Sequence, residues 1–225
     1  RITDFNLLKD TLDIGDFVSV TGKLFKTKRG EKSVNAKKVV IAAKSLRPLP
    51  TTWYGFHDEE ERLRKRYLDI IFNPEIKDLI EKKAKFWKSI RNFLLDRGFL
   101  EVETPVLETT PGGADARPFV THHNALNLDV YLRISMGELW QKRLMVAGFE
   151  KTFEIGRIFR NEGISPEHAQ DYTQMEFYWA YADYHDGMKL VERMYKHVAA
   201  AAFGTLKFKI KDFTIDLEKP WETYS

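Results

Sequence analysis

The chain has 225 residues and a formal net charge of +3, with 36 Lys and Arg against 33 Asp and Glu. This charge is too small to indicate nucleic-acid binding by itself, and the absence of cysteine excludes disulfides and thiolate metal sites. We recognise neither a secretory leader nor an apolar run that could span a membrane, and we expect a cytoplasmic protein. The length fits one large domain, or a domain with a smaller piece.

The N-terminal part of the chain, up to residue 46, is typical of β structure. Residues 16–27 and 33–43 are rich in β-branched and aromatic side chains, and a turn at 28–31 separates them. They predict either a small antiparallel sheet of any kind or the end of an OB-type barrel, a fold that binds oligonucleotides. The proline-bearing residues 45–60 then indicate a linker.

A long amphipathic helix is predicted over residues 74–99. Apolar side chains recur there every three or four positions, and Gly98 is suited to end the helix. Residues 99–107 predict a strand in which Pro105 cannot donate to a sheet ladder. We therefore expect this strand at a sheet edge or at an interface.

A glycine-bearing loop follows at residues 109–118. Its Gly112 and Gly113 would let backbone amides approach a ligand closely, because glycine has no side chain. A short strand at 131–134 and a helix at 138–148 are predicted after this loop.

Residues 153–181 predict two strands joined by a long polar turn. Side chains alternate between the two faces of a strand, which sorts the polar and apolar residues here. One face collects Glu154, Gly156, Ile158, Arg160, Gln174, Glu176 and Tyr178. The other face collects Phe153, Ile155, Phe159, Met175, Phe177 and Trp179. We therefore expect a functional site on the first face of this hairpin.

The remaining residues complete a mixed fold. Residues 186–203 predict a second amphipathic helix that Gly204 ends, and residues 205–217 alternate as a strand or hairpin. Together the elements predict an α+β protein with a mixed, mainly antiparallel sheet flanked by helices.

Several segments resemble the class II aminoacyl-tRNA synthetases. Their motif 1 is similar to Arg97–Gly98–Phe99 with Val102 and Pro105, and their motif 2 to FRNEG at 159–163 with QMEFY at 174–178. Within that class the sequence resembles the lysyl-tRNA synthetases. This likeness rests on SLRPLP at 45–50, RYLDI at 66–70, EVETPVL at 101–107, PGGADARPF at 111–119 and YADY at 181–184. The series runs in the family's order through almost the whole chain.

The resemblance implies three parts. Residues 1–46 would be the C-terminal part of an OB-fold anticodon-binding domain, and residues 47–66 a linker. Residues 67–225 would be the N-terminal part of the catalytic domain, with motifs 1 and 2 but without the family's glycine-rich motif 3. Because the chain also opens with Arg1 rather than Met, we expect a piece that is truncated at both ends and inactive alone.

The family joins lysine to ATP as lysyl-adenylate and then transfers the lysyl group to the 3′ end of tRNA(Lys). The resemblance implies that Arg160 is catalytic, since a fixed guanidinium matches the oxygens of the reacting phosphate. It implies an ATP-binding set of Arg160, Asn161, Glu162, His168 and Tyr172. After His168 the family continues with Asn-Pro-Glu-Phe, whereas this chain has Ala-Gln-Asp-Tyr, so an amide contact is lost and aromatic stacking on adenine is kept.

Selection of lysine requires acceptors for two ammonium groups, because an unpaired ammonium is costly to desolvate. The resemblance implies that these acceptors are Gly113, Glu138, Glu176 and Tyr178. The pair Met136–Gly137, directly before Glu138, makes this segment one residue longer than the family pattern. Glu138 is equally suited to complement the dipole at a helix N-terminus.

The resemblance further implies Mg²⁺ as a cofactor, with its carboxylate ligands outside these 225 residues and no metal site within them. It also implies a homodimer through the motif 1 region around Pro105. Two alternatives stay open: a lysyl transferase that acts on a protein, and a non-catalytic nucleic-acid-binding or scaffold paralogue. The β-rich residues 11–46 argue against the first, whose members lack the barrel.

Overall fold

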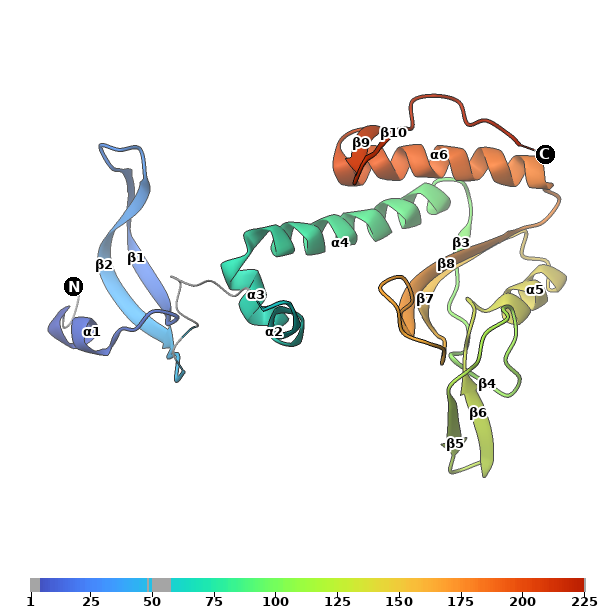
Figure 1. Cartoon of the computed structure of the whole chain (residues 1–225), viewed down its shortest axis with the longest axis horizontal. Coiled ribbons are helices and arrows are strands. Elements are labelled where there is room, and N and C mark those ends of the chain that lie inside the picture. The colour runs from blue at the N-terminus through green and yellow to red at the C-terminus, as the bar shows by residue number, and fades with distance from the viewer. Residues whose placement is uncertain (1–4, 48, 50–57, 225) are drawn as a thin grey trace. The chain divides into compact units, whose positions relative to one another are not determined.

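The structure of the protein, a computed structural model, describes residues 5–47, 49 and 58–224. It divides into two compact units, Arg1–Asp78 and Leu79–Ser225, which are described separately. Figure 1 shows the helices and strands of both units. Within the described residues, no helix is both long enough and apolar enough to cross a membrane.

The first unit contains a two-stranded antiparallel sheet. Helix α1 (Phe5–Thr11) precedes strands β1 (Phe17–Lys26) and β2 (Lys32–Ala43), whose register places Val20 opposite Val39. The predicted pair of strands is therefore confirmed, and the described residues contain no closed barrel. The assignment of the sheet to an OB-type domain stays a prediction. Part of the predicted linker, residues 48 and 50–57, lies outside the described residues.

Two short helices end the first unit. Helices α2 (Glu59–Arg64) and α3 (Arg66–Phe72) meet at Asp69, whose side chain is fully buried. The Asp69 carboxylate accepts hydrogen bonds from Arg62 Nε at 2.8 Å and Asn73 Nδ2 at 2.6 Å, and it pairs with Arg66. These partners satisfy the buried carboxylate and join the two helices.

Helix α4 (Pro74–Leu95) leads into the second unit and ends as predicted. Gly98 has a φ of +76°, which glycine adopts without the steric cost that a side chain would impose. The Phe99 amide donates to the Leu94 carbonyl at 3.1 Å, and the Gly98 amide to the Leu95 carbonyl at 3.0 Å. This pair of bonds closes the helix in a Schellman motif and turns the chain into the sheet.

The single strand predicted over residues 99–107 is wrong. The segment forms two strands of two residues each, β3 (Leu100–Glu101) and β4 (Leu107–Glu108). Strand β3 pairs in parallel with β7 (Lys151–Phe159), whereas β4 pairs antiparallel with β6 (Leu128–Leu132). The Val102 amide donates the last bond to β7, and Pro105, which has no amide hydrogen, lies in the segment between the two strands.

The second unit holds two three-stranded sheets. In the first, β7 is central between β3 and β8 (Asp171–Trp179), and β7 pairs antiparallel with β8 over their whole length. In the second, β6 is central between β4 and β5 (Val120–His123). The predicted hairpin is thus confirmed, while the strand predicted at 131–134 ends at Leu132, and the next residues leave the sheet.

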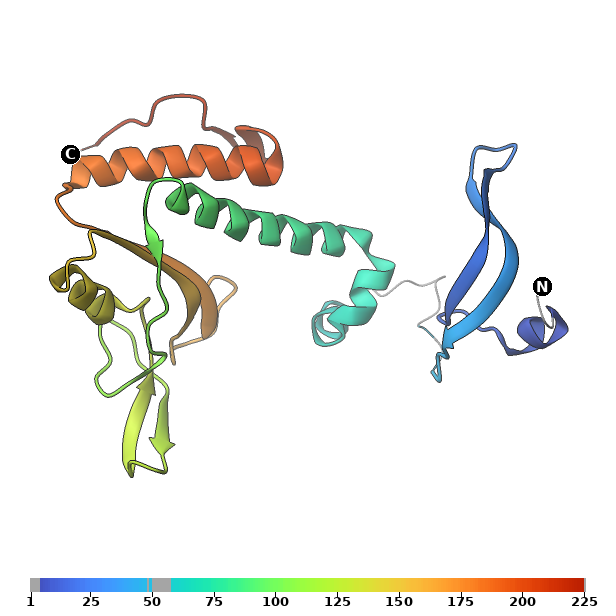
Figure 2. The ribbon, with the colours of Figure 1, turned by 180° about the vertical axis from the view of Figure 1, so that it is seen from behind.

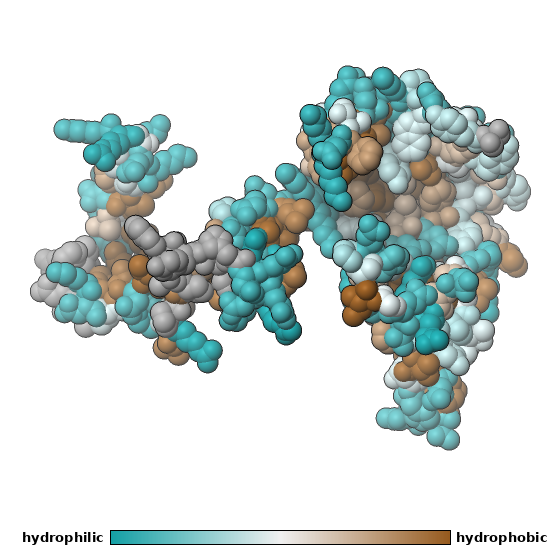
Figure 3. Space-filling model, viewed as in Figure 1, coloured by the Kyte–Doolittle hydropathy of each residue, from teal (hydrophilic) through white to brown (hydrophobic). Residues whose placement is uncertain are grey.

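One face of the β7–β8 hairpin forms the core with two helices. Figures 1 and 2 agree that α4 and α6 (Tyr184–Phe203) run side by side. The core cluster contains Phe93 of α4, Phe153 of β7 and Met194 of α6, with Ile155 and Phe177 packed against it. Figure 3 shows apolar side chains in the hollow beneath α6. The apolar face of the hairpin therefore packs as predicted.

Helix α6 begins two residues earlier than predicted because a capping box fixes its start. The Asp183 side chain accepts from the Asp186 amide at 3.0 Å, and the Asp186 side chain accepts from the Asp183 amide at 3.4 Å. Gly204, with a φ of +71°, ends the helix as predicted. Strands β9 (Lys207–Ile210) and β10 (Phe213–Asp216) then form the predicted hairpin.

Replacement of Phe153 by Ala should lower the free energy of unfolding by about 3–5 kcal/mol, because its fully buried ring leaves a cavity. The matched control is Phe213→Ala. The Phe213 side chain is 70% exposed, so its removal should change the free energy of unfolding little. Urea denaturation followed by circular dichroism measures both. Equal losses for the two variants would contradict the proposed core.

Candidate active site

The polar face of the hairpin is covered by the segment Arg133–Gly137, which we call the crossing segment. Its first four residues are buried, although they belong to no helix or strand. The Phe159 amide donates to the Arg133 carbonyl at 3.0 Å, and the Met136 amide donates to Glu176 Oε2 at 3.3 Å. The crossing segment is therefore bonded to both strands.

A buried ion pair fixes the start of the crossing segment. Arg133 Nη1 lies 2.6 Å from Glu154 Oε1, and the two side chains are 4% and 5% exposed. Arg133 Nε donates to the Arg157 carbonyl at 2.9 Å, and the Thr104 hydroxyl donates to Glu154 Oε2 at 2.6 Å. Each charge thus has further hydrogen-bond partners, which a buried pair needs to offset its desolvation.

Gly156 leaves the space that this ion pair occupies. A Cβ atom at Gly156 would lie 2.6 Å from Arg133 Nη2 and 2.7 Å from Met136 Cε. Any side chain there would displace the guanidinium or the crossing segment. A glycine is therefore required at position 156 because another segment approaches the strand closely. Isolated glycines in strands often have this cause.

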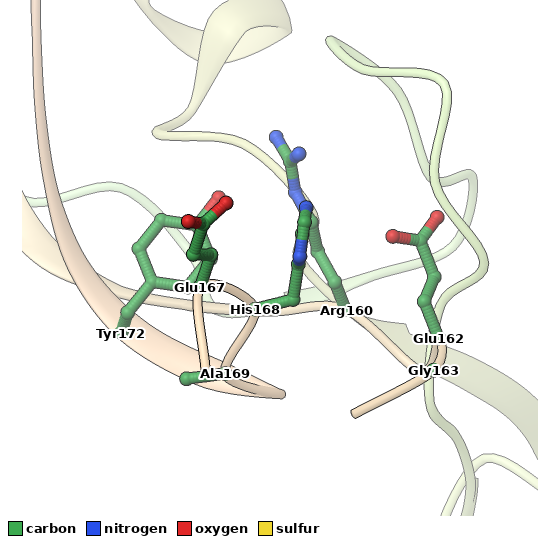
Figure 4. Close-up of a pocket in the computed structure, with 7 residues that line it drawn as sticks. All are labelled: Arg160, Glu162, Gly163, Glu167, His168, Ala169 and Tyr172. Atoms are coloured by element: carbon green, nitrogen blue, oxygen red, sulfur yellow. The ribbon is translucent and has the colours of Figure 1, made fainter. Parts of the chain in front are cut away.

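A pocket of roughly 320 Å³ opens where β7 passes into the loop before β8. Its lining residues are Arg160, Glu162, Gly163, Glu167, His168, Ala169 and Tyr172. In the view of Figure 4, Arg160, His168 and Glu162 project to the same side of the loop backbone. Four of the five residues predicted for ATP thus line one pocket.

Asn161 is the member of that set that does not line the pocket. Its backbone amide donates to the Arg117 carbonyl at 2.7 Å, which ties the loop to the glycine-bearing segment. Arg160 is held over the pocket instead: its Nε donates to the Ile134 carbonyl at 3.3 Å, and its guanidinium carbon lies 5.8 Å from the centre of the Tyr172 ring. This ring supports the cation through its π face.

Ser165, which no sequence motif singles out, orients His168. The Ser165 hydroxyl lies 2.7 Å from His168 Nδ1, and the His168 amide donates to the Ser165 carbonyl at 3.1 Å. A partner on Nδ1 leaves the other ring nitrogen, Nε2, free to meet a ligand. The spacing of a hydroxyl three residues before a histidine in a turn could have indicated this pair.

The second group of predicted residues surrounds Glu176. The Tyr178 hydroxyl donates to Glu176 Oε1 at 2.9 Å, and Gln174 Nε2 donates to Oε2 at 3.2 Å. Burial raises the pKa of Tyr178 above its ordinary value, and so do the hydrogen bond to Glu176 and the negative charges of Glu176 and Glu138. The Tyr178 phenol thus contacts Glu176 directly, and the negative charge of Glu138 adds a smaller effect.

Glu138 and Gly113 adjoin the same cluster. A Cβ atom at Gly113 would lie 2.6 Å from Glu138 Oε2 and 2.0 Å from Ser135 Oγ, so the loop approaches both groups with only its backbone. Glu138 begins helix α5 (Glu138–Val146), as predicted, and forms an ion pair with Lys142.

Gly137 absorbs the extra residue before Glu138. It has a φ of +62°, a left-handed conformation that favours glycine, and occupies the N-cap position of α5. Its carbonyl accepts the Gln141 amide at 2.7 Å, while Gln141 Nε2 donates to the Met136 carbonyl at 2.8 Å. The longer segment therefore does not remove Glu138 from the cluster around Tyr178.

The crossing segment brings the two groups together. Arg160 is bonded to Ile134, and Glu176 is bonded to Met136, two residues further along. Two residues span at most about 7 Å of backbone. The arginine-lined pocket and the carboxylate cluster are therefore adjacent parts of one site.

No group of three or more His, Cys, Asp or Glu within the described ranges is arranged to hold a metal ion. Two carboxylates of the acid cluster have other partners: Glu176 accepts hydrogen bonds from a phenol and an amide, and Glu138 pairs with Lys142. Glu176 and Glu138 therefore do not form a Mg²⁺ site with the described residues.

The hairpin with its arginine pocket and acid cluster agrees with the family to which the sequence is similar. The model of the family described as "tRNA synthetases class II (D, K and N)" matches residues 58–225. The chain belongs to this family.

Three similar relatives within the family share one name. The "Lysine--tRNA ligase" of Pelotomaculum thermopropionicum is 54% identical over 210 residues, and that of Moorella thermoacetica is 53% identical over 210 residues. The corresponding protein of Carboxydothermus hydrogenoformans is 51% identical over 215 residues. These matches cover 93%, 93% and 96% of this chain but 41%, 43% and 44% of the relatives. The chain thus spans less than half of their length, and the predicted resemblance to lysyl-tRNA synthetases is confirmed.

Breaking the buried pair by Arg133→Met should lower the free energy of unfolding by about 3–5 kcal/mol, because Glu154 is left charged and buried. The double variant Arg133→Met/Glu154→Met should recover much of this loss, since no unpaired charge remains. Denaturant titration measures both. An equal loss in the two variants would mean that the lost free energy of unfolding comes from packing and not from charge pairing.

Tyr178 should make the protein sensitive to alkali. Its folded-state pKa is raised, so its contribution to stability is complete below the unfolded pKa of about 10 and is lost as the pH rises above that value. Tyr178→Phe should therefore lose less stability than the wild type between about pH 10 and 11.5. Thermal melts across this range test it, with Tyr181→Phe, a 96% exposed position, as the control expected to behave like the wild type.

Proposed function

We propose that this chain provides part of the active site of a lysine–tRNA ligase, which activates lysine with ATP and then transfers it to tRNA(Lys). The observation that supports this best is the adjacency of Arg160 and Glu176 across the crossing segment. Such a site suits a ligand with a phosphate at one end and an ammonium group at the other. Lysyl-adenylate has this shape and charge distribution.

In the proposed first step, a carboxylate oxygen of lysine attacks the α-phosphorus of ATP. A bond forms between that oxygen and phosphorus, and the bond to the leaving pyrophosphate breaks. The Arg160 guanidinium, fixed by Ile134 and Tyr172, stabilises the charge that develops on the phosphate oxygens. His168, oriented by Ser165, would contact the departing phosphates, and Tyr172 would stack on adenine.

Lysine would be selected by the carboxylate cluster. Glu176 and Glu138 provide negative charge, and the Tyr178 hydroxyl provides a further polar contact. Gly113 would offer its backbone because no side chain fills the space between it and Glu138. A neutral side chain of similar length would bring no positive charge to these acids and would therefore bind less well than the lysine ammonium group.

In the second step, a hydroxyl of the terminal ribose of tRNA(Lys) attacks the carbonyl carbon of the adenylate, and AMP leaves. Asn161 and Glu162, at the start of the loop, are suited to contact ATP or this acceptor end. Mg²⁺ would supply additional charge neutralisation on the phosphates, from carboxylates other than those described above. We place this reaction in the cytoplasm.

We also propose a homodimer through the region around Pro105. Leu100, Val106 and Leu107 flank this proline and are exposed, although they are apolar. An apolar strip beside two very short strands is suited to a partner that continues the packing. Sedimentation of the protein at several concentrations would report this association.

The binding of a non-hydrolysable lysyl-adenylate mimic tests the proposed site. Calorimetry should detect binding that Arg160→Ala weakens by a factor of about 100 or more, because one preorganised contact to the phosphate is removed. The control is Arg157→Ala, since the Arg157 side chain lies on the face of β7 opposite that of Glu154 and Gly156 and pairs with Asp171. Absence of binding by the wild type would favour the non-catalytic scaffold instead.

A further inference from the structure

A second pocket lies at the other end of the β7–β8 hairpin. It encloses roughly 270 Å³ beside the pair formed by Lys151, the first residue of β7, and Trp179, the last of β8. Eight residue steps along β7, about 26 Å, separate Lys151 from Phe159 beside the Arg160 pocket. The two pockets are therefore distinct.

Four basic side chains line this second pocket: Arg97, Lys151, Lys189 and Arg193. We call them the basic cluster. Within the described part of the chain, none of the four forms an ion pair with a carboxylate. Many other basic residues do, among them Arg62, Arg91, Arg133, Arg157 and Lys196. Among the described residues, the four charges of the basic cluster are therefore not neutralised by ion pairs with carboxylates.

Two members of the basic cluster are held in place by aromatic rings. The Arg97 guanidinium carbon lies 3.5 Å from the centre of the Phe93 ring, and Nη1 donates to the Phe93 carbonyl at 2.9 Å. Lys151 Nζ lies 4.9 Å from the centre of the Trp179 ring and donates to the Arg97 carbonyl at 3.2 Å. Fixed cations bind an anion without first losing side-chain freedom.

The other two members repel each other. Lys189 and Arg193 are four residues apart on α6, so like charges lie on adjacent turns of one face, an arrangement that destabilises a helix. The pocket has one carboxylate, Asp186, and its side chain already accepts the Asp183 amide in the capping box. With four basic side chains and one acidic side chain, the lining of the pocket has a formal charge of +3. An anion in the pocket would relieve this repulsion.

We propose that the basic cluster binds a compact polyphosphate group, such as inorganic pyrophosphate or the phosphate tail of a free nucleotide. A single phosphate carries at most about two negative charges, so linked phosphates match the balance of +3 better within this volume. Arg97 and Arg193 offer planar forks for phosphate oxygens, and the two lysines offer compact charges. The proposal does not depend on the proposed aminoacylation activity.

Calorimetric titration with inorganic pyrophosphate tests the proposal. The wild type and Arg160→Ala should both bind at the basic cluster, because Arg160 belongs to the other pocket. The double variant Lys189→Ala/Arg193→Ala should lose affinity roughly ten-fold or more, since two charged contacts are removed. Both side chains are exposed, and a thermal melt checks that the variant is folded.

The control is Lys196→Ala, which removes one positive charge from the same helix at a residue that pairs with Glu192. It should bind pyrophosphate like the wild type, and Lys189→Arg should retain binding. Absence of binding, or equal affinity in the double variant and the control, would overturn the proposal. Tighter binding of a short single-stranded RNA than of pyrophosphate, lost in the double variant, would assign the cluster to a nucleic-acid backbone and would also overturn it.

Discussion

The ion pair between Arg133 and Glu154 is the interaction on which the candidate site depends. Both side chains of the pair are buried, and the pair fixes the start of a segment that belongs to no helix or strand. A backbone in that position must find partners for its polar groups outside any regular ladder. Glu176 and Gln141 supply such partners at Met136. The charge pair therefore sets where the two halves of the site meet.

The geometry divides the site by chemistry. On one side of the crossing segment, Arg160 rests over Tyr172 at the entrance of the hairpin loop. Two residues further along the crossing segment, the Met136 amide contacts Glu176 of β8, which also accepts a hydrogen bond from the Tyr178 hydroxyl. The sheet thus places the Arg160 guanidinium a short distance from the Glu176 carboxylate. A substrate with opposite charges at its two ends could bind such a site in one orientation only.

The hairpin, the two long helices and the polar and apolar faces of the two hairpin strands could be predicted from the sequence. Alternation and helical spacing are local properties, which is why they can be recognised there. Pro105 was recognised as a residue that cannot join a ladder, yet the division of its segment between two sheets was not predicted. That division depends on partners far along the chain, in β6 and β7. Arg133 and Thr104 were missed for the same reason: each has an ordinary local pattern, and its partner Glu154 is distant. The roles assigned to the site residues rest on resemblance and stay predictions.

The central claim is that one ligand spans the two sides of the crossing segment. A crystal structure with a bound lysyl-adenylate mimic tests it most directly. We predict its phosphate against the Arg160 guanidinium and its side-chain ammonium against the Glu176 carboxylate. A mimic found with its phosphate away from Arg160, or with its ammonium group in solvent while Glu176 keeps only its present partners, would contradict the account.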